Sequence, residues 1–590
     1  MKKFTDYISF WAITNVLISK RVHLCDKRHK NHQLHLLSPE LGQEKTDITE
    51  QLILSMMPPR KSWVSLSRDT RYKNLDDGHK QRKSAARCNM LAIKWSIARD
   101  LELDVTPPYL ERLQVFVKKI QTRVQNKAFS FQKPELFPDE KDETCSRPLC
   151  KFTNLEESVI LILANKYLTE LFDGFFYEES LAFRFKRTYH GEDNYVTSHH
   201  DAIARIKEYR SRWEGKKLYV SECDLKKFYD TVSHRVVRKC YKELLKKAAK
   251  ENPGLQFDDI SRVFDAYLHC YSFPKDVYYK VEPETDPFWD EHKVKKGRCF
   301  KWAEKELLEQ GVAKCQQGLK RMQIGVPQGG ALSGLIANMV LNTVDWKMQA
   351  KMTKRDLYIR YCDDMIIIST SKKRCKKLFS EYYNGTMKLN LVPHKPKKKL
   401  KFHCKEFWDR KSKDAYLWEM GCEDAAEWIG FVGYDIRRDG LIRVRRKSFR
   451  KEMKKQKEVV FDKVLDKIKG KKRVSNDSLN YSLKNKLASM SVGKVSVWNA
   501  EFQVGEMCWC AGFRELEMNP CLAKQLRAMD RHRGFVLSAA KRRIRTMNKN
   551  GKPVVRKDII QLEDEENSDA RGMVYSYFYQ FYRKENIETK

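Results

Sequence analysis

Two adjacent aspartates, Asp363 and Asp364, stand between two short runs of apolar, β-favouring residues at positions 359–361 and 365–368. Runs of this length predict buried strands, and the polar break between them predicts the tight turn of a β-hairpin. Aspartate is rarely buried without a partner, because an uncompensated charge is costly to remove from water. The pair is therefore either an ordinary polar turn or a site for a divalent cation, since Mg²⁺ prefers oxygen ligands.

A second carboxylate site upstream favours the cation. An apolar stretch at 218–223 ends in Asp224, and residues 224–230 read D-L-K-K-F-Y-D. A glycine-rich segment, P-Q-G-G at 327–330, lies between the two carboxylate sites. Together with Y-C-D-D at 361–364, these segments resemble, in this order, the palm of bacterial reverse transcriptases of the retron and group II intron-like superfamily. They are most similar to the unknown-group, defence-associated (antiphage) enzymes.

The resemblance implies a site for nucleotidyl transfer. Its metal ligands would be three carboxylates and one backbone carbonyl, holding two Mg²⁺ ions, with Mn²⁺ as an alternative: Asp224, Asp363, Asp364 and the carbonyl of Leu225. Three further residues are implied to contact the incoming deoxynucleoside triphosphate: Arg147, Tyr229 and Gln328. Tyr229 holds the position of an aromatic residue that blocks a 2′-hydroxyl group. Arg147, in S-R-P-L, suits phosphate because its planar fork matches the phosphate oxygens.

Other segments are implied to contact nucleic acid. Arg184 ends an A-F-R segment that echoes the family's G-F-R, and residues 428–436 resemble the primer grip, which includes Gly433. A D-G pair at 439–440 then predicts a two-residue hairpin. The return strand alternates apolar residues with arginine, so that one face packs and the other presents charge to phosphates. The predicted nucleic-acid contacts are Arg184, Gly433, Arg443, Arg445 and Arg446.

The resemblance implies an α+β fold of the right-hand polymerase type. This fold has fingers, a palm built on an antiparallel sheet, an α-helical thumb and, in this chain, a helical N-terminal extension. A charged stretch at about 282–310 is interpreted as an insertion in the palm. The predicted boundaries are 1–130 for the N-terminal extension, 131–215 for the fingers, 216–436 for the palm, and 437–590 for the primer-grip return strand, thumb and C-terminal region.

The charge balance predicts a polyanionic partner. The 590 residues include 116 Lys and Arg against 78 Asp and Glu, a formal net charge of +38, and nucleic acid is the simplest partner for such an excess. A membrane surface is the competing partner, but no apolar segment is long enough to span a bilayer. Residues 7–18 faintly mimic a signal peptide but lack its cleavage site. Sixteen cysteines without metal-site spacing suit a reducing cytoplasm, and the family resemblance implies a bacterial one.

The predicted function is RNA-directed DNA synthesis from deoxynucleoside triphosphates, most simply on a bound non-coding RNA in antiphage defence. Four alternatives stay open: a template-independent DNA polymerase, a protein-primed DNA polymerase, an intron-type maturase, and an RNA-binding scaffold with a vestigial palm. The aromatic tail at 575–582 is either a packing helix or the source of a priming hydroxyl. A homo-oligomer or a partner protein also stays open.

Overall fold

The computed structural model divides the chain into two units. Unit 1 comprises Met1–Leu17 and Glu111–Glu427, and unit 2 comprises Ile18–Leu110 and Trp428–Lys590. The domain boundaries predicted from the sequence follow motifs rather than contacts, and they stay predictions. The structure describes residues 2–37, 47–74, 80–142, 145–189, 191–281, 302–309, 316–396, 405–468, 476–492, 508–549 and 575–576.

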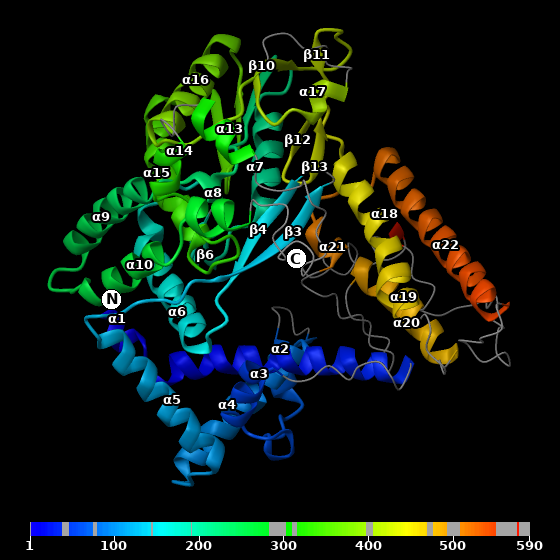
Figure 1. Cartoon of the computed structure of the whole chain (residues 1–590). Helices are drawn as coiled ribbons and strands as arrows, with labels where there is room; N and C mark the ends of the chain where they lie inside the picture. Colours follow the sequence, from blue (N-terminus) through cyan, green and yellow to red (C-terminus); the bar gives the residue numbers. More distant parts are fainter. Residues whose placement is uncertain are drawn as a thin grey trace. The chain divides into compact units, whose positions relative to one another are not determined.

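Unit 1 is built around a five-stranded sheet (Figure 1), in the order β11-β10-β7-β9-β8. All neighbouring strands are antiparallel except β10 and β11. The strands are β7 (Leu218–Cys223), β8 (Asp356–Tyr361), β9 (Asp364–Ser369), β10 (Lys413–Trp418) and β11 (Ala425–Ala426). Their side chains are mostly buried, as expected for apolar runs in a central sheet. The predicted strand before Asp224 and the predicted hairpin are both confirmed.

Helices pack against this sheet and against each other. Helix α16 (Lys372–Lys388) contacts β7, β9 and β10, and α15 (Ser333–Lys351) contacts α16 and α9 (His234–Glu251). Helix α16 begins after Ser371, whose hydroxyl accepts a hydrogen bond from the Arg374 amide, the usual role of serine at this position. A buried cluster that includes Val344, Met348 and Tyr382 joins α15 and α16 to the strands. Apolar packing of α15 and α16 therefore supports the strands of the sheet.

The predicted fingers region contains a long hairpin and two helices. The hairpin is β3 (Glu135–Asp142) with β4 (Cys145–Lys151), and a smaller one is β5 (Arg187–Tyr189) with β6 (Glu192–Tyr195). Helix α6 (Leu155–Phe172) is capped by Asn154, and α7 (His199–Arg212) begins with a capping box between Ser198 and Asp201. The other helices of the first unit or at its borders are α1 (Phe4–Tyr7), α5 (Pro108–Gln125), α8 (Phe228–Thr231), α10 (Asp258–His269), η4 (Asp173–Phe175), η5 (Pro274–Tyr278), α11 (Tyr279–Val281), α13 (Trp302–Glu309), α14 (Gln316–Arg321) and α17 (Lys405–Asp409).

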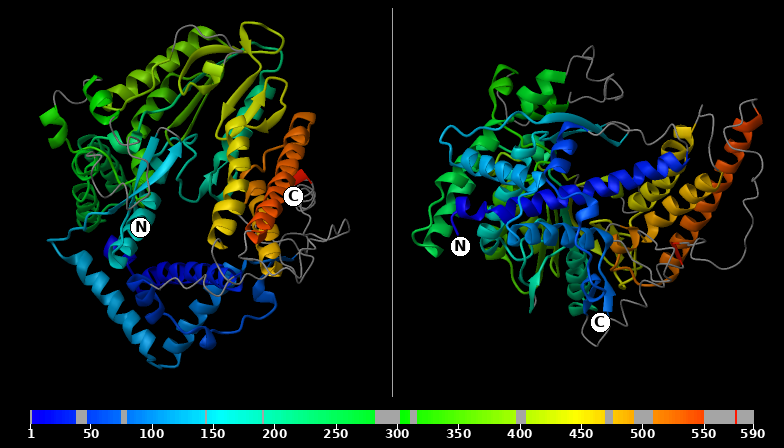
Figure 2. Two further views of the ribbon diagram at one scale, coloured as in Figure 1. Left: turned by 45° about the vertical axis from the view of Figure 1, so that its right-hand side comes forward. Right: turned by 90° about the horizontal axis from the view of Figure 1, so that it is seen from below.

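Unit 2 includes a three-stranded meander and a helical core. The meander is β12 (Trp428–Phe431), β13 (Tyr434–Arg437) and β14 (Ile442–Val444). Gly440 turns the chain between β13 and β14 with φ of 100°, and the return strand is confirmed. The Arg437 amide donates to the Leu441 carbonyl at 2.8 Å and the Gly440 amide to the Arg437 carbonyl at 2.9 Å. The loop therefore has three residues, 438–440, rather than the predicted two. The long helices α18 (Arg446–Val460) and α22 (Pro520–Lys549) run side by side (Figure 2).

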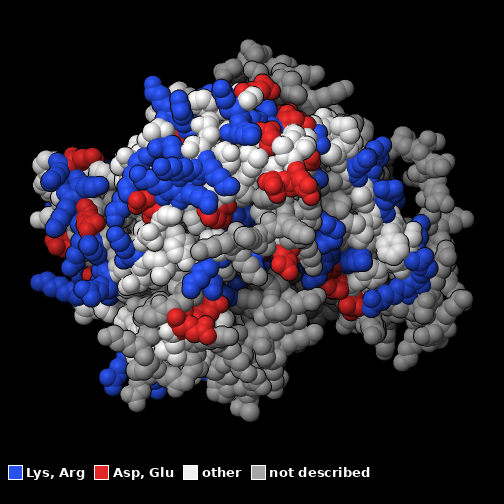
Figure 3. All heavy atoms as spheres, turned by 90° about the horizontal axis from the view of Figure 1, so that it is seen from above, with Lys and Arg blue, Asp and Glu red and all other residues white. Residues whose placement is uncertain are grey.

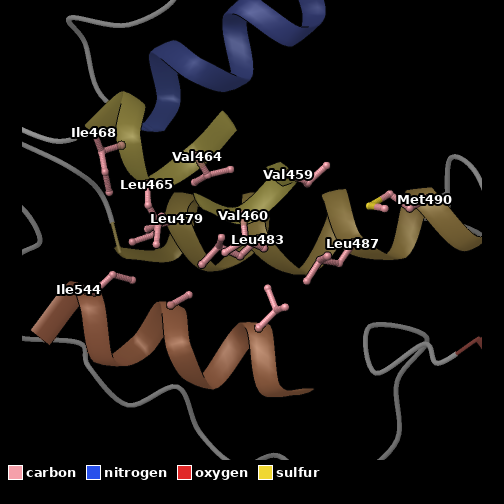
Figure 4. Close-up of a cluster of buried hydrophobic side chains, with 12 residues drawn as sticks. Val459, Val460, Val464, Leu465, Ile468, Leu479, Leu483, Leu487, Met490 and Ile544 are labelled. Carbon is pink, nitrogen blue, oxygen red and sulfur yellow. The ribbon is translucent and has the colours of Figure 1, made fainter. Parts of the chain in front are cut away.

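The helical core of unit 2 is closed by apolar side chains from five elements (Figure 4). These elements are α18, η6 (Phe461–Leu465), α19 (Asp466–Ile468), α20 (Asn476–Val492) and α22. Val460, Val464 and Leu479 are each 0% exposed. Truncating a leucine in such a core costs about 2–5 kcal/mol. The α-helical thumb predicted from the sequence corresponds to this core.

The C-terminal part of the chain returns to this core through Tyr575. Tyr575 is 1% exposed, and its hydroxyl donates to Glu452 of α18 at 2.7 Å. Its ring lies edge-on to Trp509 of α21 (Trp509–Gly512), with centroids 5.4 Å apart. Residues 577–582 of the aromatic tail lie outside the described residues, as do 282–301 and 310 of the predicted insertion.

The region before residue 111 is mostly helical where it is described, as the sequence predicted. It contains α2 (Phe10–Leu37), α3 (Ile48–Ser55), η1 (Arg60–Ser62), η2 (Asp69–Arg71), β1 (Tyr72–Asn74), β2 (Lys80–Arg82) and α4 (Ala85–Glu102). Tyr109 donates to Asp100 at 2.6 Å, and Arg99 pairs with the same carboxylate at 2.8 Å. Among all the helices that the structure describes, none combines the length and apolarity needed to cross a membrane.

Candidate active site

Two of the predicted catalytic carboxylates lie at the same end of the sheet. Asp224 directly follows β7, and Asp363 lies in the turn between β8 and β9. The pairing of Cys223 with Met365 places these two positions on neighbouring strands. Burial and then the charge of Asp224 raise the pKa of Asp363. Two carboxylates that repel each other and are partly removed from water form an oxygen-rich site that suits a cation.

The turn that carries Asp363 is strained and is held by two contacts. Cys362 has φ of 58°, in a region that non-glycine residues rarely occupy. Arg360 Nη1 donates to the carbonyl oxygen of Cys362 at 2.8 Å, and the Tyr229 hydroxyl lies 3.0 Å from Cys362 Sγ in a hydrogen bond. Strain of this kind costs about 1–3 kcal/mol and persists only where the surroundings determine it. The structure therefore joins the predicted nucleotide contact Tyr229 directly to the turn.

Arg360 is fully buried, and a polar network satisfies it. Its Nε and Nη2 atoms contact the Asp345 carboxylate of α15 at 2.6–3.1 Å, and both side chains are 0% exposed. Arg360 also donates to Ser180 at 2.6 Å and to Asn338 at 3.3 Å, while the Tyr358 hydroxyl donates to Asp345 at 2.6 Å. Removing one partner of a buried pair costs about 3–5 kcal/mol. The network thus fixes the catalytic turn to α15.

A lysine that the sequence did not reveal neutralises Asp224. Lys411 Nζ lies 2.5 Å from Asp224 Oδ2. The sheet register accounts for this contact: Lys413 of β10 pairs with Glu222 of β7, so that Lys411, two residues earlier, comes opposite Asp224. Lys413 Nζ also lies 2.5 Å from Glu222 Oε2. Two lysines spaced two residues apart, at and just before β10, thus pair with two carboxylates spaced two residues apart, at and just after β7.

The chemistry of these donors fits a divalent cation. Asp224 and Asp363 offer carboxylate oxygens, and Leu225 offers a carbonyl in the residue that follows Asp224. Asp364 is exposed at the first position of β9. Within the described ranges, no three His, Cys, Asp or Glu side chains gather closely enough to hold a metal ion. The full three-carboxylate ligand set is therefore a prediction, whereas the convergence of its first two members is observed.

Gln328 lies in a loop that is bonded to helix α8. Its Nε2 donates to Asp230 Oδ1 at 2.7 Å, and Asp230 is 1% exposed. Gly325 of the same loop has φ of 86°, and an added Cβ would lie 2.7 Å from Phe273 Cβ, so that only glycine fits. The buried ring of His234 contacts the Gly325 carbonyl through Nε2 at 2.6 Å. Burial lowers the pKa of His234 to about 4.

Strand β4 brings a second predicted nucleotide contact to this loop. The Cys150 amide donates to the Gln328 carbonyl at 2.8 Å, and Leu149 forms a parallel bridge with Gln328. Arg147 is exposed and lies two residues before Leu149, on the same face of the strand and about 7 Å along it. The fold thus places Arg147 and Gln328, which are far apart in the sequence, near each other.

Arg184 requires a correction. Its side chain is 1% exposed and pairs with Asp173, with Nε 2.8 Å from Oδ1. The guanidinium also donates to the carbonyl oxygens of Tyr177 and Ser180, both at 2.8 Å. A guanidinium enclosed in this way offers no surface to a nucleic acid. Arg184 instead holds together the loop that follows α6, and the A-F-R pattern alone did not reveal its burial.

The hairpin predicted as the primer grip forms within unit 2. Its turn consists of Val432 and Gly433, with φ of 38° and 95°, as a two-residue turn of type I′ requires. The Gly433 carbonyl accepts a hydrogen bond from the Arg445 amide at 2.9 Å. Gly433 is therefore explained by backbone geometry, and its contact with nucleic acid stays a prediction.

The arginines of this hairpin differ in their availability. Arg443 lies 3.8 Å from the centre of the Trp428 ring and 3.2 Å from Asp435, so part of its charge is engaged within the hairpin. Arg445 is half-buried, and Arg446 is exposed at the first residue of α18. Arg446 is thus the most accessible of the predicted phosphate contacts in this region.

A family comparison agrees with the geometry. Residues 275–436 match the family described as reverse transcriptase (RNA-dependent DNA polymerase). This range includes the Gln328 loop and the hairpin of Asp363 and Asp364. Asp224 lies upstream of the match, but strand β7, which precedes it, pairs with β9 inside the matched range. The predicted fold class is confirmed, and the matched family is one of RNA-dependent DNA polymerases, the enzyme class that the sequence predicts.

Solved telomerase structures are similar to this chain at low identity. One is apo telomerase from Candida tropicalis truncated from its C-terminal domain, at 14% identity and a TM-score of 0.32, covering 56% of this chain and 59% of that one. Another is apo telomerase from the same organism, at 13% identity and a TM-score of 0.33, covering 83% of this chain and 67% of that one. The chain thus spans about three fifths of the first telomerase. No curated protein matches the chain.

The sequence analysis did not identify three residues of the candidate site: Arg360, Asp230 and Lys411. Arg360 carries a faint signal, because a charged residue within an apolar strand needs a buried partner. Asp230 and Lys411 carry none, since Gln328 and Asp224 lie 98 and 187 positions from them. Only the assembled sheet and loop reveal these pairs.

Proposed function

We propose that this protein is a reverse transcriptase that makes DNA on an RNA template. The observation that carries the proposal is the convergence of Asp224 and Asp363 at one end of a sheet in which residues 275–436 match the family. Carboxylates placed in this way are what nucleotidyl transfer requires, because the reaction develops negative charge on phosphate oxygens.

Each predicted residue has a role in this proposal. Asp224, Asp363 and Asp364, with the Leu225 carbonyl, would hold two Mg²⁺ ions, which stabilise the attacking and leaving oxygens when bound. Tyr229, fixed against Cys362, lies under the sugar of the incoming nucleotide and leaves no room for a 2′-hydroxyl. Gln328 lines the nucleotide cleft, and Arg147 grips the triphosphate. Gly433, Arg443, Arg445 and Arg446 contact the nucleic-acid backbone.

The Asp363→Asn variant tests the proposal. Loss of one carboxylate is expected to reduce DNA synthesis at least about 10³-fold, since metal stabilisation of the transition state is worth several kcal/mol. The fold is expected to persist, because burial and Asp224 already disfavour the charged form of Asp363. Primer extension and a thermal melt measure the two effects. Asp414→Asn, on strand β10 of the same sheet, is the control, and full synthesis by Asp363→Asn would refute the assignment.

The biological setting is a finer part of the proposal. The resemblance in the motifs supports synthesis on a bound non-coding RNA in antiphage defence. Sequencing the nucleic acid that copurifies with the protein, and the DNA made with Mg²⁺ and four deoxynucleotides, tests it. A small RNA with complementary DNA supports it, DNA without a complement indicates untemplated synthesis, and absence of DNA favours the scaffold. Phage plating with the Asp363→Asn variant then tests the defence role.

The structure limits which tyrosine could prime DNA synthesis on protein. Tyr575 is buried, and its hydroxyl donates to Glu452. Burial together with the charge of Glu452 raises the pKa of Tyr575, which disfavours the nucleophilic phenolate. A priming hydroxyl, if synthesis begins on protein, therefore belongs to another residue. A protease-sensitive, labelled DNA–protein adduct that survives Tyr575→Phe would agree with this exclusion.

A further inference from the structure

The end of the sheet opposite the catalytic carboxylates carries concentrated positive charge. Three segments meet there: residues 212–217 lead into β7, residues 351–355 lead into β8, and residues 372–377 follow β9 and begin α16. Together they contain eleven Lys and Arg and one acid, Glu214. All of their lysines are exposed, as are two of their arginines. These three segments are called the distal basic surface.

Hydrogen bonds lock the three segments together. Arg374 Nη2 donates to the Lys351 carbonyl at 3.1 Å and pairs with the buried carboxylate of Asp356. The Tyr209 hydroxyl of α7 donates to the Arg355 carbonyl at 2.5 Å, so the helix that leads into residues 212–217 is held against residues 351–355. The backbone that carries these charges is therefore already ordered, which reduces the conformational entropy lost when a ligand binds.

This surface is well separated from the catalytic carboxylates. Strand β7 lies between Lys217 and Asp224, and the seven residue steps that separate these two residues in extended chain span about 23 Å. That separation exceeds the Debye length of about 8 Å at physiological salt. Figure 3 shows Lys and Arg side chains gathered in broad patches on one face of the molecule. The distal basic surface is thus electrostatically independent of the predicted catalytic carboxylates.

The side chains that the distal basic surface exposes indicate which kind of molecule it can bind. In these three fully described segments, no large apolar side chain is exposed, so nothing is available to insert into a lipid bilayer or to stack on an unpaired base. Exposed lysines instead suit regularly spaced phosphates. On the side of strand β10, the exposed acids Glu423 and Asp424 bound the surface and would repel a polyanion.

We propose that the distal basic surface binds the phosphate backbone of a double-helical RNA segment, separate from the strand being copied. The surface would dock a folded part of an RNA while another part occupies the cleft. Because it lies at the other end of the sheet, this binding does not depend on nucleotidyl transfer.

The test compares two sets of substitutions with equal charge change. The distal variant carries Lys217→Ser, Lys354→Ser, Lys373→Ser and Lys377→Ser. The control carries Lys239→Ser, Lys242→Ser, Lys246→Ser and Lys250→Ser on α9, where all four side chains are also exposed. The affinity of the full chain for a 20-base-pair RNA hairpin is measured without nucleotides at several salt concentrations. A melting curve confirms that both variants fold.

The proposal predicts an unequal result. The distal variant is expected to bind at least about tenfold more weakly and to lose about three to four units of salt dependence, because each phosphate contact contributes about 0.9. The control is expected to stay within about threefold of the unaltered protein. Equal losses in both variants, no loss in the distal variant, or a loss confined to single-stranded RNA would overturn the proposal. A loss seen only with anionic vesicles would overturn it in favour of a membrane.

Discussion

The two ends of the central sheet use the same three strands but are built on different physical principles. At the catalytic end, Asp363 depends on the strained turn at Cys362, which depends on Arg360, which depends on buried Asp345. At the other end, exposed lysines act through summed charge. Buried networks are strongly coupled, whereas exposed charges contribute small and nearly independent amounts. Single substitutions should therefore be decisive at the first end and weak at the second.

The largest expected effect comes from breaking the buried network. Arg360→Met leaves Asp345 charged and unpaired in the core, and the free energy of unfolding should fall by about 3–5 kcal/mol. Urea denaturation followed by tryptophan fluorescence measures it. The control is Lys347→Met on the exposed side of α15, which should change stability by no more than about 0.5 kcal/mol. If Arg360→Met and Lys347→Met lowered the free energy of unfolding equally, the burial of Arg360 would not explain its contribution to stability.

A pH effect of similar size should arise at His234. Its pKa is about 4 in the folded protein against about 6.5 in an unfolded chain. Below pH 6.5 His234 becomes protonated in the unfolded chain, whereas in the folded protein it stays neutral until about pH 4. Stability therefore falls as the pH falls through this window, by about 3 kcal/mol in total.

The His234→Gln variant isolates that contribution. Gln keeps an amide that can contact the Gly325 carbonyl, but it does not titrate. Unfolding measured at pH 7 and pH 5 should show a smaller loss in the variant than in the unaltered protein. An identical loss in both proteins would assign the pH dependence to other groups.

A smaller effect tests the orientation of Gln328. A carboxylate only accepts hydrogen bonds, so Asp230 holds the Gln328 amide with its nitrogen inward and its carbonyl oxygen outward. Gln328→Glu places two acceptors in contact and should raise the KM for deoxynucleotides about tenfold, the loss of about 1.4 kcal/mol. Adding Asp230→Asn restores a donor and should recover most of that loss. A double variant no better than Gln328→Glu alone would exclude this positioning role.

The smallest expected effect lies at the distal end. Burial raises the pKa of Asp356, but hydrogen bonds from Arg374, Ser369 and Thr353 outweigh it, and the net pKa is lowered. Its stabilising contribution is therefore present at neutral pH and disappears as the pH falls through the lowered pKa. Asp356→Asn should cost about 1 kcal/mol at pH 7, since Arg374 stays partly in water. A cost equal to that of Arg360→Met would remove the contrast between the two ends.

The sequence predicted what depends on local pattern. Apolar runs revealed β7, β8 and β9, and the D-G pair revealed the turn at Gly440. The polymerase motifs placed Asp224 and Asp363 in one site, although neither is near the other in the chain. The side chains with which charged residues pair were less predictable, because these pairs depend on how distant segments of the chain align in the fold. Arg184 therefore appeared to be a surface contact when it is a core residue.

The return of Tyr575 to α18 has a consequence for biosynthesis. Glu452 is made 123 residues before the tyrosine that donates to it. At about 5–20 residues per second, a ribosome needs roughly 6–25 s to cover that distance. During this interval α18 can pack with its helical neighbours, but the Glu452 carboxylate has not yet formed its hydrogen bond with Tyr575. The helical core is therefore completed only after Tyr575 has been made, and a polypeptide interrupted before Tyr575 would lack the hydrogen-bond donor to Glu452.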